Sequence, residues 1–449
     1  MKVDVLVAEI GSTTTVVNAF DRLDSDEPRY LGQAMSATTV EEGDVLEGLH
    51  GAVRALRHRL GADRLDWEMM LASSSAAGGL RMTVHGLVYD MTVKAANEAA
   101  LGAGAVVKMV TAGDLTEADL NRLKQTRPNI ILLAGGVDYG EKNTAIGNAR
   151  RLAELDLDVP IIFAGNVACT DEIRDILSPT VHLVDNVYPR IDQLNVEPTR
   201  RVIQDVFESH IVTAPGMGRV REMVEGSLMP TPGAVMEAAK VLYEVVGDLM
   251  VLDVGGATTD VHSVTAGSEE ISRMLIAPEP VAKRTVEGDL GVYVNAGNLV
   301  NRIGEEDLSD ELGFPVRRVM EHLPQIPENQ QEIELVTRLT REAAEVAVSR
   351  HAGRLRHLYG PTGRSTVAEG KDLTQVRWVI GTGGALTRLP GGCDILTSLC
   401  DGNEPLALYP REARALVDRQ YTMASLGVLS RRHPEAARRL LTDSLCIES

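Results

Sequence analysis

The sequence of 449 residues lacks paired cysteines, an excess of basic residues and long apolar runs. Its four cysteines, Cys169, Cys393, Cys400 and Cys446, form no CxxC pair, so the sequence predicts neither a zinc site nor a thiolate-held iron–sulfur cluster. The formal net charge of -19 argues against a nucleic-acid partner, because phosphate backbones select basic surfaces. A small nucleotide that arrives with a cation remains compatible with this charge.

Membrane segments and long linkers are also missing. No stretch approaches about 20 uninterrupted apolar residues, and acidic residues interrupt the first apolar stretch, MKVDVLVAEIG. We therefore expect a cytoplasmic protein with no membrane partner. The length is too great for one ordinary core, so we expect two or more domains. No low-complexity tract separates them, and the composition is that of a soluble globular protein.

One short pattern occurs twice, as EIGSTTT at 9–15 and DVGGATTD at 253–260. Each copy follows an apolar run and precedes another strand-like stretch, so both predict a strand, a tight turn and a second strand. Glycine and small hydroxyl residues form a turn whose backbone N–H groups and hydroxyls can surround a phosphate. The carboxylate at the end of the first strand is then left over to bind a metal ion.

The middle of the chain, from 75 to 245, alternates short apolar runs with helical stretches. IILLAGG at 130–136, TAIGNARRLAEL at 144–155 and VPIIFAGN at 159–166 predict a parallel strand–helix–strand unit. The segments 133–138 and 164–166 end predicted parallel strands, where open α/β sheets place ligands. Whether they bind a ligand is left open.

The last third of the chain contains a third glycine motif. An apolar-striped helix is predicted at 332–353, and a strand at 376–380 leads into GTGGA at 381–385. Glycines directly after a buried strand let the backbone approach a flat ligand. The tail at 409–441 is predicted to be helical and amphipathic.

The two carboxylate–glycine–hydroxyl turns, followed by the strand and GTGGA, resemble the acetate and sugar kinase, heat-shock chaperone and actin superfamily. The resemblance implies an α/β fold with two actin-like ATPase (ribonuclease H-like) domains and an α/β insertion in the first half. We expect the first part of the N-terminal domain at 1–74, the inserted region and the return to the first half at 75–245, and the C-terminal domain at 246–449.

The resemblance also implies which residues bind ATP and Mg2+. Two phosphate loops and one adenosine-contacting turn are expected at Gly11, Ser12, Thr13 and Thr14; at Gly255, Gly256, Thr258 and Thr259; and at Gly381, Gly383 and Gly384. Asp253 would hold magnesium through water or orient the attacking water. Glu9 stands where the superfamily usually has aspartate, so its catalytic and metal role is a departure to be tested.

Narrower strings are similar to one family within this superfamily. AGGLRM at 77–82, LLAGGVDYG at 132–140, VYPRIDQLN at 187–195 and DVGGATTDVHSV at 253–264 resemble the glutamate mutase L family, also written MutL, which is unrelated to the mismatch-repair protein of that name. The resemblance implies an ATPase that acts as a chaperone-like reactivating factor. Its client would be an adenosylcobalamin-dependent mutase of the glutamate mutase or ornithine aminomutase type, from which it promotes exchange of damaged cobalamin. A homodimer is one assembly that the sequence allows.

Three other functions fit the same signature less well. A small-molecule kinase on the same fold would need a catalytic base, for which Asp289 or Asp138 could be recruited. A filament-forming actin relative is less attractive because of the large insertion. An electron-delivering activator of a radical dehydratase would need cysteines that hold a bridging cluster, and the scattered thiols argue against it.

Two further patterns predict ordinary structure rather than a site. Asp260-Val-His262 resembles the start of a cobalamin motif, but Thr265 replaces its glycine, so we expect His262 to be a satisfied strand histidine. Gly102-Ala-Gly104 opens a dinucleotide fingerprint whose third glycine is Val107, so we expect close helix packing there.

Overall fold

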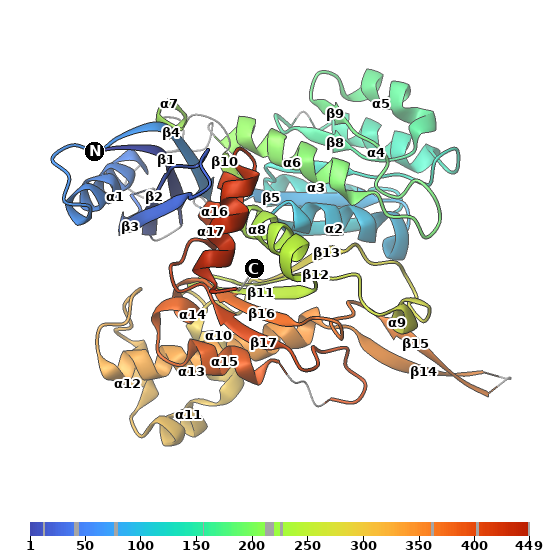
Figure 1. Cartoon of the computed structure of the whole chain (residues 1–449). Coiled ribbons are helices and arrows are strands. Elements are labelled where there is room, and N and C mark those ends of the chain that lie inside the picture. The colour runs from blue at the N-terminus through green and yellow to red at the C-terminus, as the bar shows by residue number, and fades with distance from the viewer. Residues whose placement is uncertain are drawn as a thin grey trace. The chain divides into compact units, whose positions relative to one another are not determined.

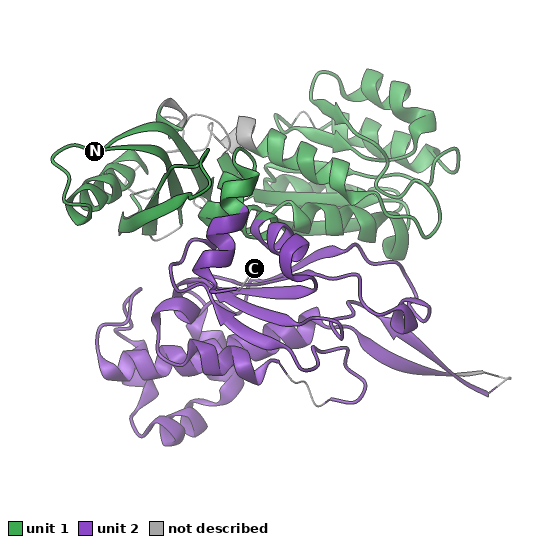
Figure 2. Cartoon of the chain, in the orientation of Figure 1, with its two compact units in different colours: residues 1–237, 424–437 green, residues 238–423, 438–449 purple. Residues whose placement is uncertain are grey.

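The computed structural model divides the chain into two compact units (Figure 2). Unit 1 holds Met1–Glu237 and Ala424–Ala437, and unit 2 holds Ala238–Met423 and Arg438–Ser449. The structure describes residues 1–11, 14–39, 45–75, 80–155, 157–211, 220–224, 228–360, 363–400 and 404–447.

The first sheet of unit 1 has five strands in the order β10-β4-β1-β2-β3. Its strands are β1 (Lys2–Ile10), β2 (Thr14–Asp21), β3 (Arg29–Ala37), β4 (Asp66–Ser74) and β10 (Leu228–Pro230). β2 is antiparallel to β1 and β3, whereas β4 is parallel to β1 and β10. Helix α1 (Val45–Arg59) contacts β2 and β3, and its buried residues repeat at helical spacing on one face.

The sheet of unit 2 repeats this arrangement, with the order β13-β12-β11-β16-β17. Its strands are β11 (Leu249–Val254), β12 (Thr259–Val264), β13 (Ala282–Glu287), β16 (Trp378–Thr382) and β17 (Arg414–Val417). β12 is antiparallel to β11 and β13, whereas β16 is parallel to β11 and β17. Numbered along the chain within each sheet, both orders read 3-2-1-4-5, which confirms the predicted pair of actin-like ATPase domains.

Helix α13 (Gln330–His351) covers the central strands of the unit 2 sheet with an apolar face that includes Leu335, Leu339 and Ala343. It begins at a capping box, in which Asn329 and Glu332 each bond the other's backbone N–H. This helix was predicted two residues further along the chain. The C-terminal tail differs more: residues 414–417 form β17 instead of helix, because their backbone joins the ladder of β16.

A second sheet of unit 1 lies between β4 and β10 in the chain, and all its strands are parallel (Figure 1). Its order is β6-β5-β7-β8-β9, with β5 (Leu80–Gly86), β6 (Ala105–Ala112), β7 (Ile130–Leu133), β8 (Ile161–Phe163) and β9 (Val181–Leu183). The connecting helices are α2 (Lys94–Gly102), α3 (Glu117–Thr126), α4 (Asn143–Ala153) and α5 (Thr170–Leu177), and α6 (Val196–Ile211) follows the last strand. The predicted parallel strand–helix–strand unit is confirmed.

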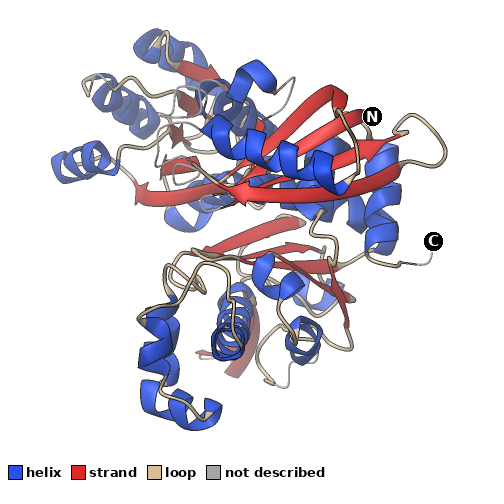
Figure 3. Ribbon diagram, turned by 90° about the vertical axis from the view of Figure 1, so that its left-hand side faces the viewer, coloured by secondary structure: helices blue, strands red, loops and turns tan. Residues whose placement is uncertain are grey.

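The remaining elements connect or border these sheets, and Figure 3 shows helices lying against the strands. They are η2 (Tyr89–Val93), η3 (Val167–Cys169), α7 (Val220–Met223), α8 (Thr231–Val246), α9 (Glu269–Ser272), α10 (Ala296–Ile303), α11 (Glu305–Leu312), α12 (Val316–Met320), the hairpin of β14 (Arg354–Gly360) and β15 (Gly363–Glu369), α14 (Gly384–Arg388), α15 (Gly392–Ser398), α16 (Met423–Ser430) and α17 (Pro434–Ser444). None of the described helices combines the length and the apolar character needed to cross a bilayer.

The glycine pair at 102 and 104 has the packing role predicted for it. A Cβ built on Gly102 would lie 2.2 Å from Nε of Arg200, a residue of α6. Gly104 has φ +98, and its Cβ would lie 2.7 Å from the backbone nitrogen of Gly233. Gly104 therefore needs glycine for close approach of backbone, whereas a side chain at Gly102 would require the Arg200 guanidinium to shift.

Candidate nucleotide-binding site

The two repeated motifs share one backbone hydrogen bond. The N–H of Gly11 donates to the carbonyl of Thr14 at 2.9 Å, and the N–H of Gly255 donates to the carbonyl of Thr258 at 2.9 Å. Ser12 and Thr13 of the first predicted loop lie outside the described residues.

The carboxylates that precede the turns occupy equivalent positions. Glu9 pairs with Val16 across the β1–β2 ladder, and Asp253 pairs with Asp260 across the β11–β12 ladder. Each stands two residues before the first glycine of its turn, at the carboxyl end of the central strand of its sheet. The Glu9 side chain is buried, with 8% of its surface exposed, and Asp253 is half-buried.

A clamp segment, residues 291–295, holds the carbonyl groups of the second turn. The N–H of Val292 donates to the carbonyl of Gly255 at 3.2 Å, and the N–H groups of Tyr293 and Val294 donate to the carbonyl of Gly256 at 2.9 and 2.8 Å. The side-chain amide of Asn295 donates to the carbonyl of Ala257 at 2.8 Å. At the start of the clamp, a Cβ on Gly291 would lie 2.3 Å from the carbonyl carbon of Ala257, so only glycine fits there.

The clamp determines where the N–H groups of this turn point. In a planar trans peptide the N–H points opposite to the preceding carbonyl. Because the carbonyls of residues 255–257 face the clamp, the N–H groups of Gly256, Ala257 and Thr258 face away from it. Within the described part of the chain, none of these three N–H groups donates a hydrogen bond. Successive N–H groups that point the same way form an anion-binding nest.

The third glycine motif lies against the second turn. β16 runs parallel to β11 with Thr382 opposite Asp253, so the two strands end side by side. Gly383 has φ +82, and a Cβ built there would lie 2.5 Å from Oδ1 of Asp253 and 2.6 Å from the carbonyl oxygen of Val254. Residues that the sequence separates by 130 positions therefore meet at one strand end.

The other two glycines of this motif have different surroundings. A Cβ on Gly384 would meet no heavy atom within 4 Å, so this backbone is open to a ligand. A Cβ on Gly381 would lie 2.6 Å from Cδ1 of Leu396, a residue of α15. Packing inside unit 2 is thus sufficient to explain the glycine at 381.

Asp418, at the carboxyl end of β17, is a residue of this site that the sequence analysis missed. It is 1% exposed and accepts hydrogen bonds from Oγ1 of Thr382 at 3.0 Å and from the N–H groups of Thr422 and Met423 at 3.0 and 2.9 Å. Burial raises the pKa of its carboxyl group, and these hydrogen bonds oppose that effect. Asp418 thereby ties the end of β16 to Thr422 and Met423, within unit 2.

The hydroxyls of the second turn are partly used within unit 2. Thr259 is buried and donates to the carbonyl of Leu290 at 2.8 Å, so it braces the turn. Thr258 donates to Oδ2 of Asp260 at 3.2 Å. Oδ1 of Asp260 is bound by Arg284 in a buried ion pair at 2.6 Å.

His262, further along β12, was expected to be satisfied by hydrogen bonds, and this expectation is wrong. The residue is fully buried, but neither ring nitrogen has a hydrogen-bond partner among the described residues. Burial and the positive charge of Arg284 lower the pKa of the ring well below its usual value. A neutral histidine here serves as a strand side chain.

The two carboxylates named as bases for a kinase are both occupied. Arg350 binds Asp289 through two nitrogens, at 2.7 and 2.9 Å, and this contact lowers the pKa of the Asp289 carboxyl. Oδ1 of Asp138 accepts from the N–H of Val167 at 3.1 Å and from the side chain of Asn186 at 2.9 Å. Neither arrangement favours proton transfer from a substrate.

The donor set of the turn is compatible with magnesium. No group of three or more His, Cys, Asp and Glu side chains in the described ranges could hold a metal ion. Magnesium does not need such a group, because it commonly binds one or two carboxylates together with substrate phosphates and water. Asp253, beside three outward N–H groups, fits that type of site.

The paired sheets and their matching turn hydrogen bonds define a protein with two domains of the actin-like fold. The family model described as MutL protein matches residues 5–445. Protein MutL of Clostridium tetanomorphum is 37% identical over 455 residues, which cover 97% of this chain and 98% of that protein. The chain belongs to the MutL family.

Two solved structures are similar to the chain at a low level. A diol dehydratase-reactivating factor in its nucleotide-free form has a TM-score of 0.40 and 13% identity, and the match covers 96% of this chain and 100% of the reactivating-factor chain. A nucleotide-free acetone carboxylase has a TM-score of 0.41 and 13% identity, and the match covers 95% of this chain and 70% of the carboxylase chain. Scores this low carry no functional inference.

Proposed function

We propose that the protein binds and hydrolyses ATP and acts as a reactivating factor for an adenosylcobalamin-dependent mutase. The observation that carries the nucleotide part is the strand end where Gly383 packs on Asp253, beside the outward N–H groups of residues 256–258. Membership of the MutL family supports the role as an accessory protein of cobalamin enzymes.

The residues of the turn have distinct tasks in this proposal. The N–H groups of Gly256, Ala257 and Thr258 bind phosphate oxygens, because fixed backbone dipoles stabilise their negative charge. Asp253 would hold magnesium through water or orient the attacking water, and the metal would supply neutralisation of the phosphate charge. The open backbone at Gly384 receives the adenosine.

The first turn would bind phosphate in the same way, with Gly11 and Thr14 beside Ser12 and Thr13. Glu9 takes the position equivalent to Asp253, so we propose that it contributes to metal or water binding despite its extra methylene. We also propose the domain division at 1–74, 75–245 and 246–449, which places the first turn in the first of these segments and the second turn in the last.

Nucleotide binding would drive opening or closing of the two halves, which is a common mode of switching. The client would be a mutase of the glutamate mutase or ornithine aminomutase type that holds damaged cobalamin. The factor would loosen this cofactor until an intact one replaces it. We propose a cytoplasmic location, and a homodimer is compatible with this role.

Magnesium-dependent ATP hydrolysis by the purified full chain tests the nucleotide part. We expect Asp253→Ala to abolish turnover and leave the urea-unfolding midpoint close to that of the wild type. Asp310→Ala removes an exposed carboxylate on α11 and serves as the matched control, with unchanged turnover. Unchanged turnover in Asp253→Ala would remove Asp253 from the mechanism.

A further inference from the structure

Exposed large apolar side chains of unit 1 gather at one edge of its second sheet. Apart from Met1, every such residue described in this unit follows the carboxyl end of a parallel strand. We name this group the edge patch; it consists of Val88, Tyr89, Tyr139, Val167 and Ile191. Tyr139 is 84% exposed, Ile191 69% and Tyr89 63%. Apolar surface concentrated in this way marks interaction sites in soluble proteins.

The topology places these residues on neighbouring loops. They follow β5, β7, β8 and β9, which are consecutive in the sheet order β6-β5-β7-β8-β9. Neighbouring strands lie about 4.8 Å apart, so the loops after them lie side by side. The carboxyl edge of an open parallel sheet is also where α/β folds place their binding sites.

Hydrogen bonds hold two of these loops rigidly to each other. The N–H of Val167 donates to Oδ1 of Asp138 at 3.1 Å, and the N–H of Tyr139 donates to Oδ1 of Asn166 at 2.9 Å. The bonds are reciprocal: in each loop, one residue accepts through its side chain and the next donates through its backbone. Tyr139 and Val167 are therefore fixed next to one another.

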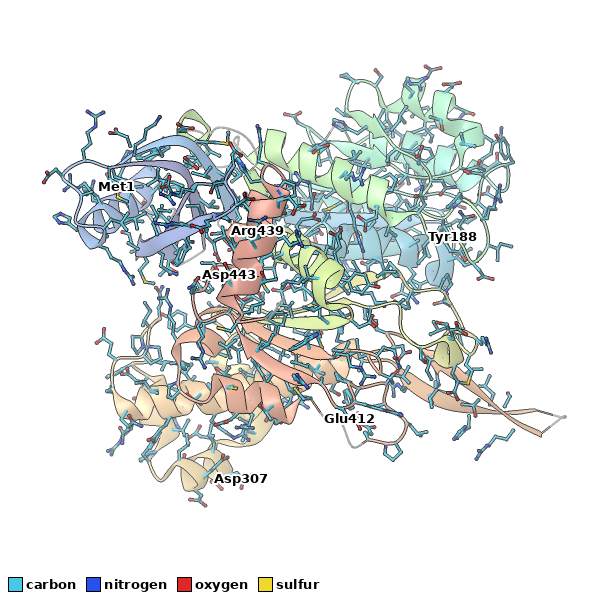
Figure 4. All side chains as sticks on the ribbon, viewed as in Figure 1. Met1, Tyr188, Asp307, Glu412, Arg439 and Asp443 are labelled. Atoms are coloured by element: carbon cyan, nitrogen blue, oxygen red, sulfur yellow. The ribbon has the colours of Figure 1, made fainter. Side chains whose placement is uncertain are left out.

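The loop after β9 is held to the same framework. Asn186 donates to the carbonyl of Gly136 at 3.0 Å and to Oδ1 of Asp138 at 2.9 Å. The N–H of Asp138 donates to the carbonyl of Pro189 at 3.0 Å. Buried Tyr188, labelled in Figure 4, accepts the N–H of Asp192 at 2.9 Å, next to Ile191. A preorganised surface of this kind loses little conformational entropy when it binds.

Internal packing makes a small polar ligand a poor fit for this edge. A Cβ on Gly136 would lie 2.4 Å from the carbonyl oxygen of Glu141, and a Cβ on Gly165 would lie 2.6 Å from the nitrogen of Gly135. Gly136 thus serves a contact within its own loop, and Gly165 serves a contact between two loops. Both atoms of the buried Asn166 amide are bound internally. What faces outward is a set of tyrosine and aliphatic side chains, which are typical anchors of protein–protein interfaces.

The charge around the edge patch indicates the charge of the partner surface that would complement it. The loops at 87–93, 134–142, 164–169 and 184–195 carry more acidic than basic side chains, namely Asp90, Asp138, Glu141, Asp185 and Asp192 against Lys142 and Arg190. A complementary surface has an apolar centre and a basic rim.

We propose that the edge patch is the docking surface for the client mutase, through an apolar face with a basic rim. This assignment rests on the proposed function, because the function identifies the class of partner. The inserted sheet then recognises the client, whereas the turns of the two ATPase domains handle nucleotide. A variant of the edge patch should therefore separate client binding from nucleotide binding.

The test is binding of the full-length chain to a purified mutase holoenzyme that carries inactive cobalamin. The variant is Tyr139→Asn with Ile191→Asn. Tyr139 has φ +61, a conformation that asparagine tolerates better than tyrosine, and both side chains are exposed, so the fold should be retained. Ile326→Asn, at a residue of unit 2 that is 53% exposed, is the matched control.

We expect mutase affinity to fall about tenfold or more in the double variant, with ATP affinity unchanged and the control equal to wild type. If the double variant bound the mutase as tightly as the wild type does, the edge patch would not be the docking surface, and the proposed function would remain intact. No binding by the wild type would contradict the proposed function and the edge patch together. Loss of self-association in the double variant, with mutase binding unchanged, would assign the surface to a second copy of the chain and overturn the proposal.

Discussion

Gly383→Ala probes the junction between the third glycine motif and Asp253. The new Cβ would lie 2.5 Å from Oδ1 of Asp253, 2.6 Å from the carbonyl oxygen of Val254 and 2.8 Å from its nitrogen. At φ +82 a side chain adds strain of about 1–2 kcal/mol. Overpacking against backbone adds about 1–3 kcal/mol. We expect the free energy of unfolding to fall by about 2–5 kcal/mol, with weaker ATP binding because Asp253 is displaced.

The adjacent glycine supplies the matched control for this prediction. A Cβ on Gly384 meets no heavy atom within 4 Å, so Gly384→Ala should change the free energy of unfolding by less than about 0.5 kcal/mol. If the adenosine lies on this backbone, Gly384→Ala should still weaken ATP binding. Urea unfolding gives the stability of both variants, and calorimetric titration gives their ATP affinity. Equal stability of the two variants would refute the close contact between Gly383 and Asp253.

Three further predictions concern single residues. Burial lowers the pKa of His85 to about 4, below the ordinary 6.5, so the unfolded chain binds the proton first as pH falls. The free energy of unfolding, measured in urea, should therefore fall by about 3 kcal/mol between pH 6.5 and about 4. His85→Gln should make this fall with pH smaller. An equally large fall in the variant would contradict the assignment to His85. Asp418→Asn should lower the free energy of unfolding by about 1–3 kcal/mol, because an amide N–H₂ group can replace the carboxylate oxygen that accepts three hydrogen bonds. An unfolding midpoint equal to that of the wild type would count against this role. Gly291→Ala should disturb the clamp and weaken ATP binding in calorimetry, whereas full affinity would show that the clamp does not orient the nest.

The individual elements could be predicted because their signals are local, whereas the pair of actin-like domains was expected only from the resemblance to the superfamily. A carboxylate at the end of an apolar run, followed by glycine and hydroxyl residues, specifies a strand–turn–strand unit within a few residues, and the turns at Gly11 and Gly255 have that form. The apolar stripe of α13 likewise follows from helical spacing. These features need no knowledge of distant contacts.

The missed parts of the site depend on contacts between distant segments. Arg414–Val417 was predicted to be helical because its charge pattern is amphipathic, and only pairing with β16 makes it a strand. That error concealed Asp418, although a carboxylate directly after a short apolar run is the same signal that identified Asp253. The role of Gly291 arises from its distance to Ala257 across a loop, which the sequence does not encode locally.

Recovery of an inactivated adenosylcobalamin-dependent mutase tests the central claim most directly. The mutase, carrying damaged cobalamin, is mixed with the full-length chain, magnesium, ATP and fresh adenosylcobalamin, and mutase activity is followed over time. We predict recovery with the wild-type chain, and none when ATP is omitted or when Asp253→Ala replaces the wild type. Recovery that is equally fast without ATP, or with the Asp253 variant, would contradict an ATP-driven reactivating factor.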